Sequence, residues 1–570
     1  MTAAPNPGTP GRLLVLGSLT LGFALLLFLR LGYWQIVRRP ELIELGQLEY
    51  YRERTIPAQR GSILDRHETL LAGDIYAYEV FATPRDVPSP EWTAQQLAPL
   101  LGQPAGRLWE LLREEALGIT LAKGVPLEAG DQLQELSLPG IGVSPLPQRV
   151  YPQGPLAAHL LGFVGADGQA FYGLEEAYNS LLLGRPGSRG GERDPAGAAV
   201  PVVYGSFVPA ADGPSLVVSL DATIQALVEE ELRRGLRESG AESGTIIVMD
   251  PRNGQILAMA SQPAYDPNRY FETQPHELFA NPAISQVYEP GSVFKVVTMA
   301  AALDSGLVTP ESTYVDNGLI MVGGRPIYNW NRAAYGQVNM TQLLAQSLNV
   351  GAATLSTRMG PETFYQYVQA FGFGETSGID LAGEIPGLLK LPGDPSWHES
   401  DLGTNAFGQG IGVTPLQMIT AVASIANGGQ LVTPQLGLQL VTPTGPHPIE
   451  PQMPRRQVIK PDTALTLAHM LEEGIRGETV LAQVPGYSLA GKTGTAQIPI
   501  PGGYDPIWTI ASFIGFGPRE DPQFIILVKL DRPSVAPWGS VVAAPVFSRI
   551  AQQLFSYLGI PPDDFRLVDR

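Results

Sequence analysis

The 570-residue chain contains no cysteine. This absence excludes disulfide bonds, thiolate catalysis and cysteine-based metal sites, so the chain is indifferent to the redox state of its compartment. Six histidines are scattered without the spacing of a metal site, and we expect no metal and no other cofactor. Basic residues are also few, 37 Lys and Arg against 55 Asp and Glu, which gives a net charge of −18. Nucleic acid is therefore not an expected partner, because phosphate binding needs clustered positive charge.

Long apolar runs are scarce as well, and the exception lies at the amino terminus. Residues 13–29 carry no charge, and the apolar character resumes after Arg30. A helix over residues 13–36 would be about 36 Å long, enough to cross the hydrocarbon core of a bilayer. A cleaved signal peptide is the alternative, but no small-residue cleavage site follows the run. We therefore expect a retained membrane anchor at 13–36, preceded by a cytoplasmic tail at 1–12.

Glycine and proline mark the division of the rest of the chain. Residues 184–214 are rich in Gly, Pro and Ala, and we interpret them as an extended or hairpin-like connection. A strand-like segment at 216–220 comes first. Two more follow at 245–249 and 255–260, and three lie at 488–497, 509–515 and 524–530 after a long helical stretch. The order of two strands, helices and three strands predicts an α+β fold, one antiparallel sheet of five strands with a helical subdomain inserted in it. The expected domains are 40–215 and 216–570.

Two helices of the second domain are predicted by their caps. Asp221 can cap a helix that runs to about residue 237. The stretch Thr414-Pro415-Leu416-Gln417 has the pattern of a capping box and opens a helix through residue 425. The glycines of 408–412 precede this box without the Gly-Lys-Ser/Thr ending of a phosphate loop, so we interpret them as structural.

Three short motifs carry the chemistry. They are Ser292-Val293-Phe294-Lys295, Ser347-Leu348-Asn349 and Lys492-Thr493-Gly494-Thr495. A single Ser-x-x-Lys is weak, since chance supplies one on the order of once in a few chains of this length. The chain has six lysines, however, and two of them fall inside these motifs. Together the motifs predict one active site.

The first motif sets a nucleophile beside a base. Ser292 and Lys295 are one helical turn apart, so the hydroxyl and the amine share a face. A serine hydroxyl is a poor nucleophile unless a neighbour removes its proton, and a lysine does this when its pKa is depressed. Burial, the helix amino terminus and a second cation such as Lys492 all lower that pKa. The structural alternative is a serine cap followed by a surface lysine, and the other two motifs outweigh it.

The other two motifs supply polar groups for a peptide. The Ser347 hydroxyl can relay a proton to a leaving amine, and the Asn349 amide can hold a peptide carbonyl. The third motif lies on a predicted strand, where Gly494 permits a close backbone approach. The hydroxyls of Thr493 and Thr495, with the adjacent lysine charge, suit a substrate carboxylate.

Ser-x-x-Lys, Ser-Asp-Asn and Lys-Thr-Gly are signatures of class A β-lactamases and penicillin-binding proteins. The three motifs resemble them, and further stretches resemble class B penicillin-binding proteins, which are membrane-anchored peptidoglycan D,D-transpeptidases of division or elongation. These stretches are 60–66, 173–175 with Tyr178, 265–268, 288–291, and 407–410 with Thr414-Pro415. The resemblance covers nearly the whole chain. It implies a transpeptidase domain at 216–570 and an elongated, mixed α/β pedestal domain of the dimerisation type at 40–215.

The resemblance also implies a reaction. Ser292 attacks the penultimate D-Ala carbonyl of a stem peptide and forms an acyl-enzyme, while Lys295 takes its proton. Ser347 and Lys492 help to pass a proton to the leaving D-Ala. An amine from a neighbouring strand then resolves the ester and makes the cross-link. β-Lactams acylate Ser292 as substrate mimics.

The same resemblance assigns binding roles. Asn349 orients the peptide, and the segment Thr493-Gly494-Thr495 binds its terminal carboxylate. The backbone N–H groups of Ser292 and Thr495 form the oxyanion hole. The implied partners are peptidoglycan stem peptides, β-lactam antibiotics, the membrane and a membrane-embedded glycosyltransferase.

Several alternatives share part of this pattern. A D,D-carboxypeptidase carries all three motifs, and a non-catalytic β-lactam sensor or scaffold has the same fold, although such a scaffold is expected to lose Ser292 or Lys295. A β-lactamase would need a residue that activates the deacylating water, and it carries Asp where this chain has Leu348. A bifunctional class A enzyme would need a glycosyltransferase domain, whose paired acidic motif is absent from 40–215.

The implied substrate also decides the expected orientation. Positive charge is scarcer before the apolar run than after it, where Arg38 and Arg39 follow, so the positive-inside rule would place the large domain in the cytoplasm. Long domains translocate largely regardless of flanking charge. Because the substrate lies outside the membrane, we expect a single-pass protein with an extracytoplasmic catalytic domain.

Overall fold

The computed structural model describes residues 9–42, 51–192, 207–451 and 453–566. Two compact units make up the chain. The first combines residues 1–59 with residues 184–212, and the second combines residues 60–183 with residues 213–570.

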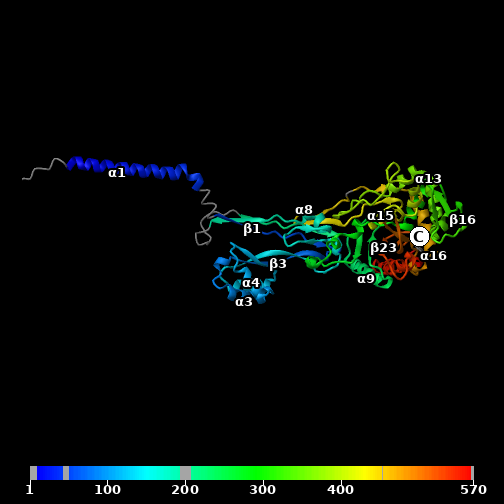
Figure 1. The fold of residues 1–570 in the computed structure, drawn as a ribbon, viewed down its shortest axis with the longest axis horizontal. Helices are drawn as coiled ribbons and strands as arrows, with labels where there is room; N and C mark the ends of the chain where they lie inside the picture. Colours follow the sequence, from blue (N-terminus) through cyan, green and yellow to red (C-terminus); the bar gives the residue numbers. More distant parts are fainter. Residues whose placement is uncertain (1–8, 43–50, 193–206, 452, 567–570) are drawn as a thin grey trace, which may run out of the picture. The chain divides into compact units, whose positions relative to one another are not determined.

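The first unit contains the apolar helix that the sequence predicts. Helix α1 (Thr9–Gly32) continues into the π-helical turn η1 (Tyr33–Val37) (Figure 1). Residues 11–37 are long and apolar enough to cross a membrane, and they are the one such segment among the described residues. Most of the expected tail at 1–12 lies outside the described residues.

A small antiparallel sheet completes this unit. Strand β8 (Gly187–Glu192) pairs on one side with β1 (Tyr51–Ile56) and on the other with β9 (Phe207–Val208). The expected hairpin-like connection at 184–214 therefore contains strands at both of its described ends. Its middle, residues 193–206, lies outside the described residues.

The predicted five-stranded antiparallel sheet is confirmed in the second unit. Its strand order is β12 (Ile256–Gln262), β11 (Ser243–Met249), β23 (Phe524–Asp531), β22 (Gly503–Gly517) and β21 (Ala490–Ile500). Strand β21, which carries the third motif, lies at one edge of this sheet, where a peptide can pair with its free backbone groups.

Alternating side chains place a separate core on each face of the sheet. On one face of the sheet, the side chains of Ile247 and Ile514 pack in a common core with the helices α11 (Lys295–Asp304), α15 (Pro415–Ala426) and α16 (Pro461–Gly477). On the other face, Ile246 and Phe513 pack with α9 (Ala222–Ser239) and α18 (Ala544–Tyr557). Figure 1 shows α15 beside β23 in this unit. Helix α11, which begins at Lys295 of the first motif, is therefore held in the buried core on one face of the sheet.

Both predicted caps are confirmed. The Asp221 carboxylate accepts hydrogen bonds from the backbone N–H groups of Thr223 and Ile224 at the start of α9. The Thr414 hydroxyl accepts from Gln417 N at 3.1 Å, and Gln417 Oε1 accepts from Thr414 N at 3.0 Å. This reciprocal pair is the capping box of α15.

The inserted helical subdomain carries the second motif. Its helices are α12 (Met340–Ala345), α13 (Asn349–Ala370) and α14 (Glu399–Asn405). Two strand pairs cover them, β13 (Thr313–Asp316) with β16 (Gly336–Asn339) and β14 (Leu319–Val322) with β15 (Arg325–Tyr328). Ser347 and Asn349 lie at the junction of α12 and α13.

Residues 60–183 of the second unit form a further sheet with one strand that follows them in the chain and two strands from the carboxyl half. The strand order is β19 (Gly445–Pro448), β18 (Gly437–Thr442), β10 (Ser215–Val218), β2 (Ile63–Leu64), β3 (Leu70–Ala82) and β4 (Ile119–Val125), with β5 (Ile141–Val150) also paired to β3. The helices α3 (Pro90–Leu101), α4 (Ala105–Leu111) and α5 (Leu127–Leu136) pack with β3 and β4 around a small core of their own.

A buried ion network joins two of the stretches that carry the resemblance. Glu175, on helix α7 (Gly173–Ala177), accepts from Arg60 Nε and from Arg149 Nε, both at 2.7 Å. Arg149 also contacts Asp74 at 3.1 Å. All four side chains are nearly inaccessible to solvent. The charges are paired as burial requires, which explains why charged residues occupy these core positions.

Candidate active site

The nucleophile turn is held in place by the glycine-rich segment before α15. Ser292 lies in the 3₁₀ turn η5 (Gly291–Phe294), and Lys295 begins α11. Gly291, at φ +55°, donates its N–H to the Gly408 carbonyl at 3.1 Å. Tyr288 exchanges two backbone hydrogen bonds of 2.9 Å with Val413. The 408–413 segment is therefore structural, as the sequence predicts, and it fixes the backbone that presents Ser292.

Lys295 lies at the centre of the site. Its Nζ is 3.0 Å from Ser292 Oγ and 3.1 Å from Ser347 Oγ. It also donates to the Ser347 carbonyl at 2.6 Å and to Asn349 Oδ1 at 2.8 Å. Two of these four partners, the carbonyl and the amide oxygen, can only accept hydrogen bonds. They can take both hydrogens of a neutral amine, which leaves its lone pair for a hydroxyl proton.

Lys492 reaches the same centre from strand β21. Its Nζ donates to Ser347 Oγ at 3.0 Å and lies 3.4 Å from Thr493 Oγ1. The Ser347 hydroxyl is therefore between the two amines. A continuous path of contacts runs from Ser292 through Lys295 and Ser347 to Lys492, each step close to 3 Å.

Both amines are shifted toward the neutral form. Burial, and after it the positive charge of Lys492, holds the pKa of Lys295 well below its ordinary value. Burial lowers the pKa of Lys492 to about 8. Because the charge of Lys492 acts on Lys295 in addition to burial, a charged Lys492 favours the neutral form of Lys295. A base and a cation are both available at the same pH.

The third motif forms the opposite wall of the site. A Cβ on Gly494 would lie 2.3 Å from Ser512 Oγ on the neighbouring strand, 2.8 Å from Val293 Cγ2 and 3.1 Å from the Pro290 carbonyl oxygen, so only glycine fits between β22 and the nucleophile turn. A Cβ on Gly291 would lie 2.8 Å from the Thr495 carbonyl oxygen, so the backbones next to Ser292 and at Thr495 approach closely as well. The half-buried hydroxyls of Thr493 and Thr495 border this wall.

The structure thus brings together Ser292, Lys295, Ser347, Asn349 and Lys492 through direct hydrogen bonds. Thr493 joins them through Lys492, whereas the Thr495 hydroxyl accepts from the backbone N–H of Gly539 at 3.2 Å. The roles given to these residues by resemblance remain predictions.

Glu289 lies next to the site and is not among the site residues that the three motifs predict. Its Oε1 accepts from the backbone N–H of Gly410 at 2.9 Å and from the Tyr504 hydroxyl at 3.3 Å. Burial raises the pKa of this carboxyl group. The available signal was its position directly before Pro290-Gly291, within a stretch that carries the resemblance.

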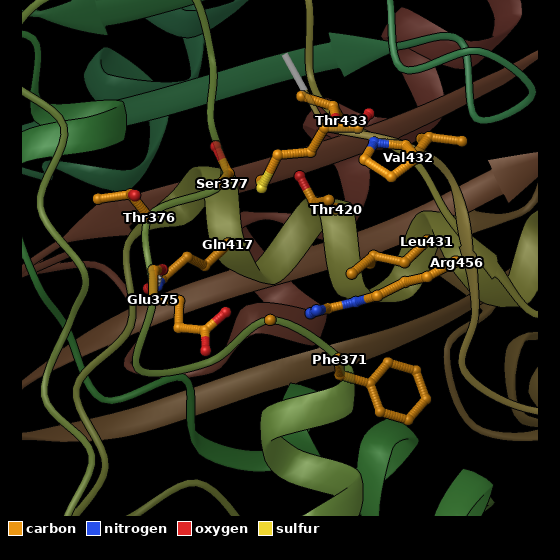
Figure 2. A pocket seen from close by; sticks show the side chains of 13 residues that line it. Phe371, Glu375, Thr376, Ser377, Gln417, Thr420, Leu431, Val432, Thr433 and Arg456 are labelled. Carbon is orange, nitrogen blue, oxygen red and sulfur yellow. Dashed lines mark hydrogen bonds between the residues drawn. The ribbon is translucent and has the colours of Figure 1, made fainter. Parts of the chain in front are cut away.

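A separate cavity of about 190 Å³ lies beside α15 (Figure 2). Its lining combines apolar side chains, such as Phe371 and Leu431, with polar ones, such as Glu375, Gln417 and Arg456. No lining residue belongs to the three motifs. The Thr420 hydroxyl, also on the lining, is buried and has no hydrogen-bond partner among the described residues. The cavity therefore contributes no catalytic group to the site.

Comparison with known proteins agrees with this geometry. The penicillin binding protein transpeptidase domain matches residues 244–552, and the penicillin-binding protein dimerisation domain matches residues 55–218. Stage V sporulation protein D of Bacillus subtilis is 34% identical over 95% of this chain and 85% of its own length. Peptidoglycan D,D-transpeptidase FtsI of Escherichia coli is 31% identical over 98% of this chain and 93% of its own.

Solved structures give the same result. A peptidoglycan synthetase from Bifidobacterium adolescentis has a TM-score of 0.74 at 26% identity and covers 90% of this chain and 98% of its own. Penicillin binding protein 3 from Mycobacterium tuberculosis, solved in complex with aztreonam, has a TM-score of 0.69 at 29% identity, with 89% and 98% covered. The chain belongs to the penicillin-binding proteins, as a class B member with a transpeptidase domain preceded by a dimerisation domain.

Proposed function

We propose that this protein is a membrane-anchored peptidoglycan D,D-transpeptidase that cross-links stem peptides through an acyl-enzyme on Ser292 and is acylated there by β-lactams. The observation that carries the proposal is the set of contacts around Lys295. A buried amine with a lowered pKa lies 3.0 Å from the Ser292 hydroxyl. Acceptor-only oxygens from Ser347 and Asn349 orient it.

In the first step, Ser292 Oγ attacks the carbonyl carbon of the penultimate D-Ala. Its proton moves to the neutral Lys295 Nζ, whose lone pair faces the hydroxyl once its two hydrogens are bound by the carbonyl and amide oxygens. The backbone N–H groups of Ser292 and Thr495 stabilise the developing oxyanion. Lys295 becomes charged as the tetrahedral intermediate forms.

In the second step, the C–N bond breaks and the terminal D-Ala leaves as an amine. The proton that it needs comes from Lys295 through the Ser347 hydroxyl, which lies 3.1 Å from Lys295 Nζ and 3.0 Å from Lys492 Nζ. Lys492, with Thr493 and Thr495, binds the terminal carboxylate of the donor. An acceptor amine then attacks the ester carbonyl and gives a proton to the restored neutral Lys295. As the ester C–O bond breaks, Lys295 returns a proton to Ser292 Oγ, which is released as the cross-link forms.

Two related activities are less well supported. A D,D-carboxypeptidase would use water in place of the acceptor amine, but relatives that match along nearly their whole length are named D,D-transpeptidases. A non-catalytic sensor or scaffold would not need the complete network of Lys295, and every member of that network is present.

The other parts of the chain have supporting roles in the proposal. The helix at 11–37 anchors the protein in the membrane, with the catalytic domain outside, because the substrate lies there. The domains are a pedestal at 40–215 and a transpeptidase domain at 216–570. The pedestal raises the catalytic site toward the cell wall and docks onto a membrane-embedded glycosyltransferase.

Covalent labelling tests the proposal. A fluorescent penicillin should attach to the full-length protein, and peptide mapping should place it on Ser292. Ser292→Ala should lose the label, whereas Ser305→Ala, at the other end of α11, should keep it. The wild-type protein should also cross-link lipid-linked glycan strands. Full labelling of Ser292→Ala, or turnover of the ester within seconds, would contradict the assignment.

A further inference from the structure

Two exposed tryptophans meet beside the active site. The rings of Trp330 and Trp538 are in edge-to-face contact, with centroids 5.5 Å apart and planes at 68°. Trp330 is 58% exposed and Trp538 is 42% exposed. They come from loops more than 200 residues apart in the chain. Their contact is therefore a tertiary feature on the surface, where burial in a core does not explain it.

Trp330 is fixed to the wall that carries the second motif. The preceding residue, Asn329, is buried, and its Oδ1 accepts from the backbone N–H of Val350 at 3.1 Å. The Tyr328 carbonyl accepts from Asn349 Nδ2 at 3.1 Å. The backbone just before Trp330 is therefore held directly against the first turn of α13, next to Asn349.

Trp538 is fixed to the wall that carries the third motif. The following residue, Gly539, donates its N–H to Thr495 Oγ1 at 3.2 Å. A Cβ on Gly539 would lie 2.2 Å from the Ser512 carbonyl oxygen and 2.3 Å from the Gly494 carbonyl oxygen, so the backbone of this residue packs directly against β22 and β21. On the other side, the Pro537 carbonyl accepts from Thr509 Oγ1 at 2.9 Å.

We propose that Trp330 and Trp538, the tryptophan bridge, close the mouth of the donor-peptide groove and select donors by the bulk of their acyl side chain. The inference rests on the proposed function, in which the donor lies between Asn349 on one wall and Thr495 on the other. Each ring is attached beside one of these residues, and the rings meet between the walls. A donor with a bulky acyl side chain must separate them to reach Ser292.

The size of the effect follows from the contact itself. An exposed edge-to-face pair favours the closed arrangement by about two- to tenfold over the open one. Removing one ring should therefore raise the acylation rate of a bulky penicillin by about two- to tenfold. A ligand without an acyl side chain, 6-aminopenicillanic acid, should gain less than twofold.

The first experiment compares these two ligands on Trp330→Ala, Trp538→Ala and the wild type. The measured quantity is the second-order rate constant of acylation, by gel for a fluorescent penicillin and by mass for 6-aminopenicillanic acid. Trp92→Ala removes an exposed tryptophan from helix α3 and serves as the matched control, with both rates unchanged. An unchanged or lower rate for the bulky ligand in both bridge variants would overturn the inference.

The second experiment uses the absence of cysteine in the natural chain. In a Trp330→Cys, Trp538→Cys double variant, the two introduced thiols are the only ones, and a short bismaleimide can join them. The joined protein should be acylated by the fluorescent penicillin at least tenfold more slowly than the unjoined one. The single variants, treated alike, should keep their rates.

The remaining outcomes are also decisive. Equal acylation of joined and unjoined protein would show that the bridge does not cross the route to Ser292. Failure of two reactive thiols to join would show that the two positions do not meet. Either result overturns the inference, yet normal labelling of Ser292 in the unjoined protein would leave the proposed function intact. Absence of Ser292 labelling in the wild type would instead contradict the proposed function.

Discussion

Replacing Lys492 by an uncharged residue should move the pH dependence of acylation. Lys295 acts as a base only when neutral, so the rate rises with pH as this amine loses its proton. Lys492 binds the donor carboxylate only when charged, so the rate falls again above pH about 8, where its pKa lies. The acylation rate of the wild type should therefore show a bell-shaped dependence on pH, with Lys295 responsible for the acid limb and Lys492 for the alkaline limb.

The distances set the size of the shift. Both amines lie about 3 Å from Ser347 Oγ, so their nitrogens are no more than about 6 Å apart. At an effective dielectric constant of about 20, two positive charges at this distance repel by about 3 kcal/mol. Lys492→Met removes this repulsion and raises the pKa of Lys295. At a pH on the acid limb, the neutral fraction of Lys295 should fall by up to about a hundredfold.

Acylation by a fluorescent penicillin, measured across the pH range, tests this reasoning. Lys492→Met should shift the acid limb to higher pH and lose the alkaline limb, in addition to a lower rate at every pH. Lys492→Arg keeps the positive charge, so its acid limb should stay in place while its alkaline limb disappears. A Lys492→Met profile with both limbs unmoved would refute the assignment of the two lysines.

Four further substitutions test the structure of the second unit. Thr420→Val replaces a buried hydroxyl that has no partner among the described residues, and it should stabilise the protein by about 1 kcal/mol. Thr414→Val, on the same helix, removes the N-terminal cap and should destabilise the protein by about 1 kcal/mol. Urea midpoints of the two variants should therefore shift in opposite directions. Gly494→Ala should slow acylation at least tenfold while the far-ultraviolet circular dichroism stays unchanged, because its methyl group would press on the Ser512 hydroxyl and on the nucleophile turn. Glu175→Gln leaves two buried guanidinium groups without their shared carboxylate, so the free energy of unfolding should fall by about 3–5 kcal/mol; a fall below 1 kcal/mol would show that the network is not essential.

Local elements were predictable because their causes lie within a few residues. The helix α15 is specified by Thr414, Pro415 and Gln417, and its cap is formed as the pattern indicates. The hairpin of β11 and β12 turns at an Asn-Gly pair, where Gly254 takes φ +81°. The contact between Ser292 and Lys295 follows from helical spacing alone. In each case the residues that determine the structure are close in sequence.

Long-range features gave no comparable signal. The pairing of β2 with β10 joins segments about 150 residues apart and depends on the whole sheet. Trp330 and Trp538 have no motif, and their contact arises from two loops whose positions are set by Asn329 and Gly539. The meeting of the three motifs was expected from resemblance, because spacing within each motif says nothing about the distance between them.

Ser347 shows most clearly what sequence could not reveal. Its φ is +56°, in the left-handed region, which costs a non-glycine residue about 1 kcal/mol or more. In this conformation, both its carbonyl and its hydroxyl lie within 3.1 Å of Lys295 Nζ, and the hydroxyl also reaches Lys492. Glycine would adopt this backbone without strain but would supply no hydroxyl. The presence of serine at a position that favours glycine is explained by the Oγ atom between the two amines, where the proposed reaction needs a proton relay.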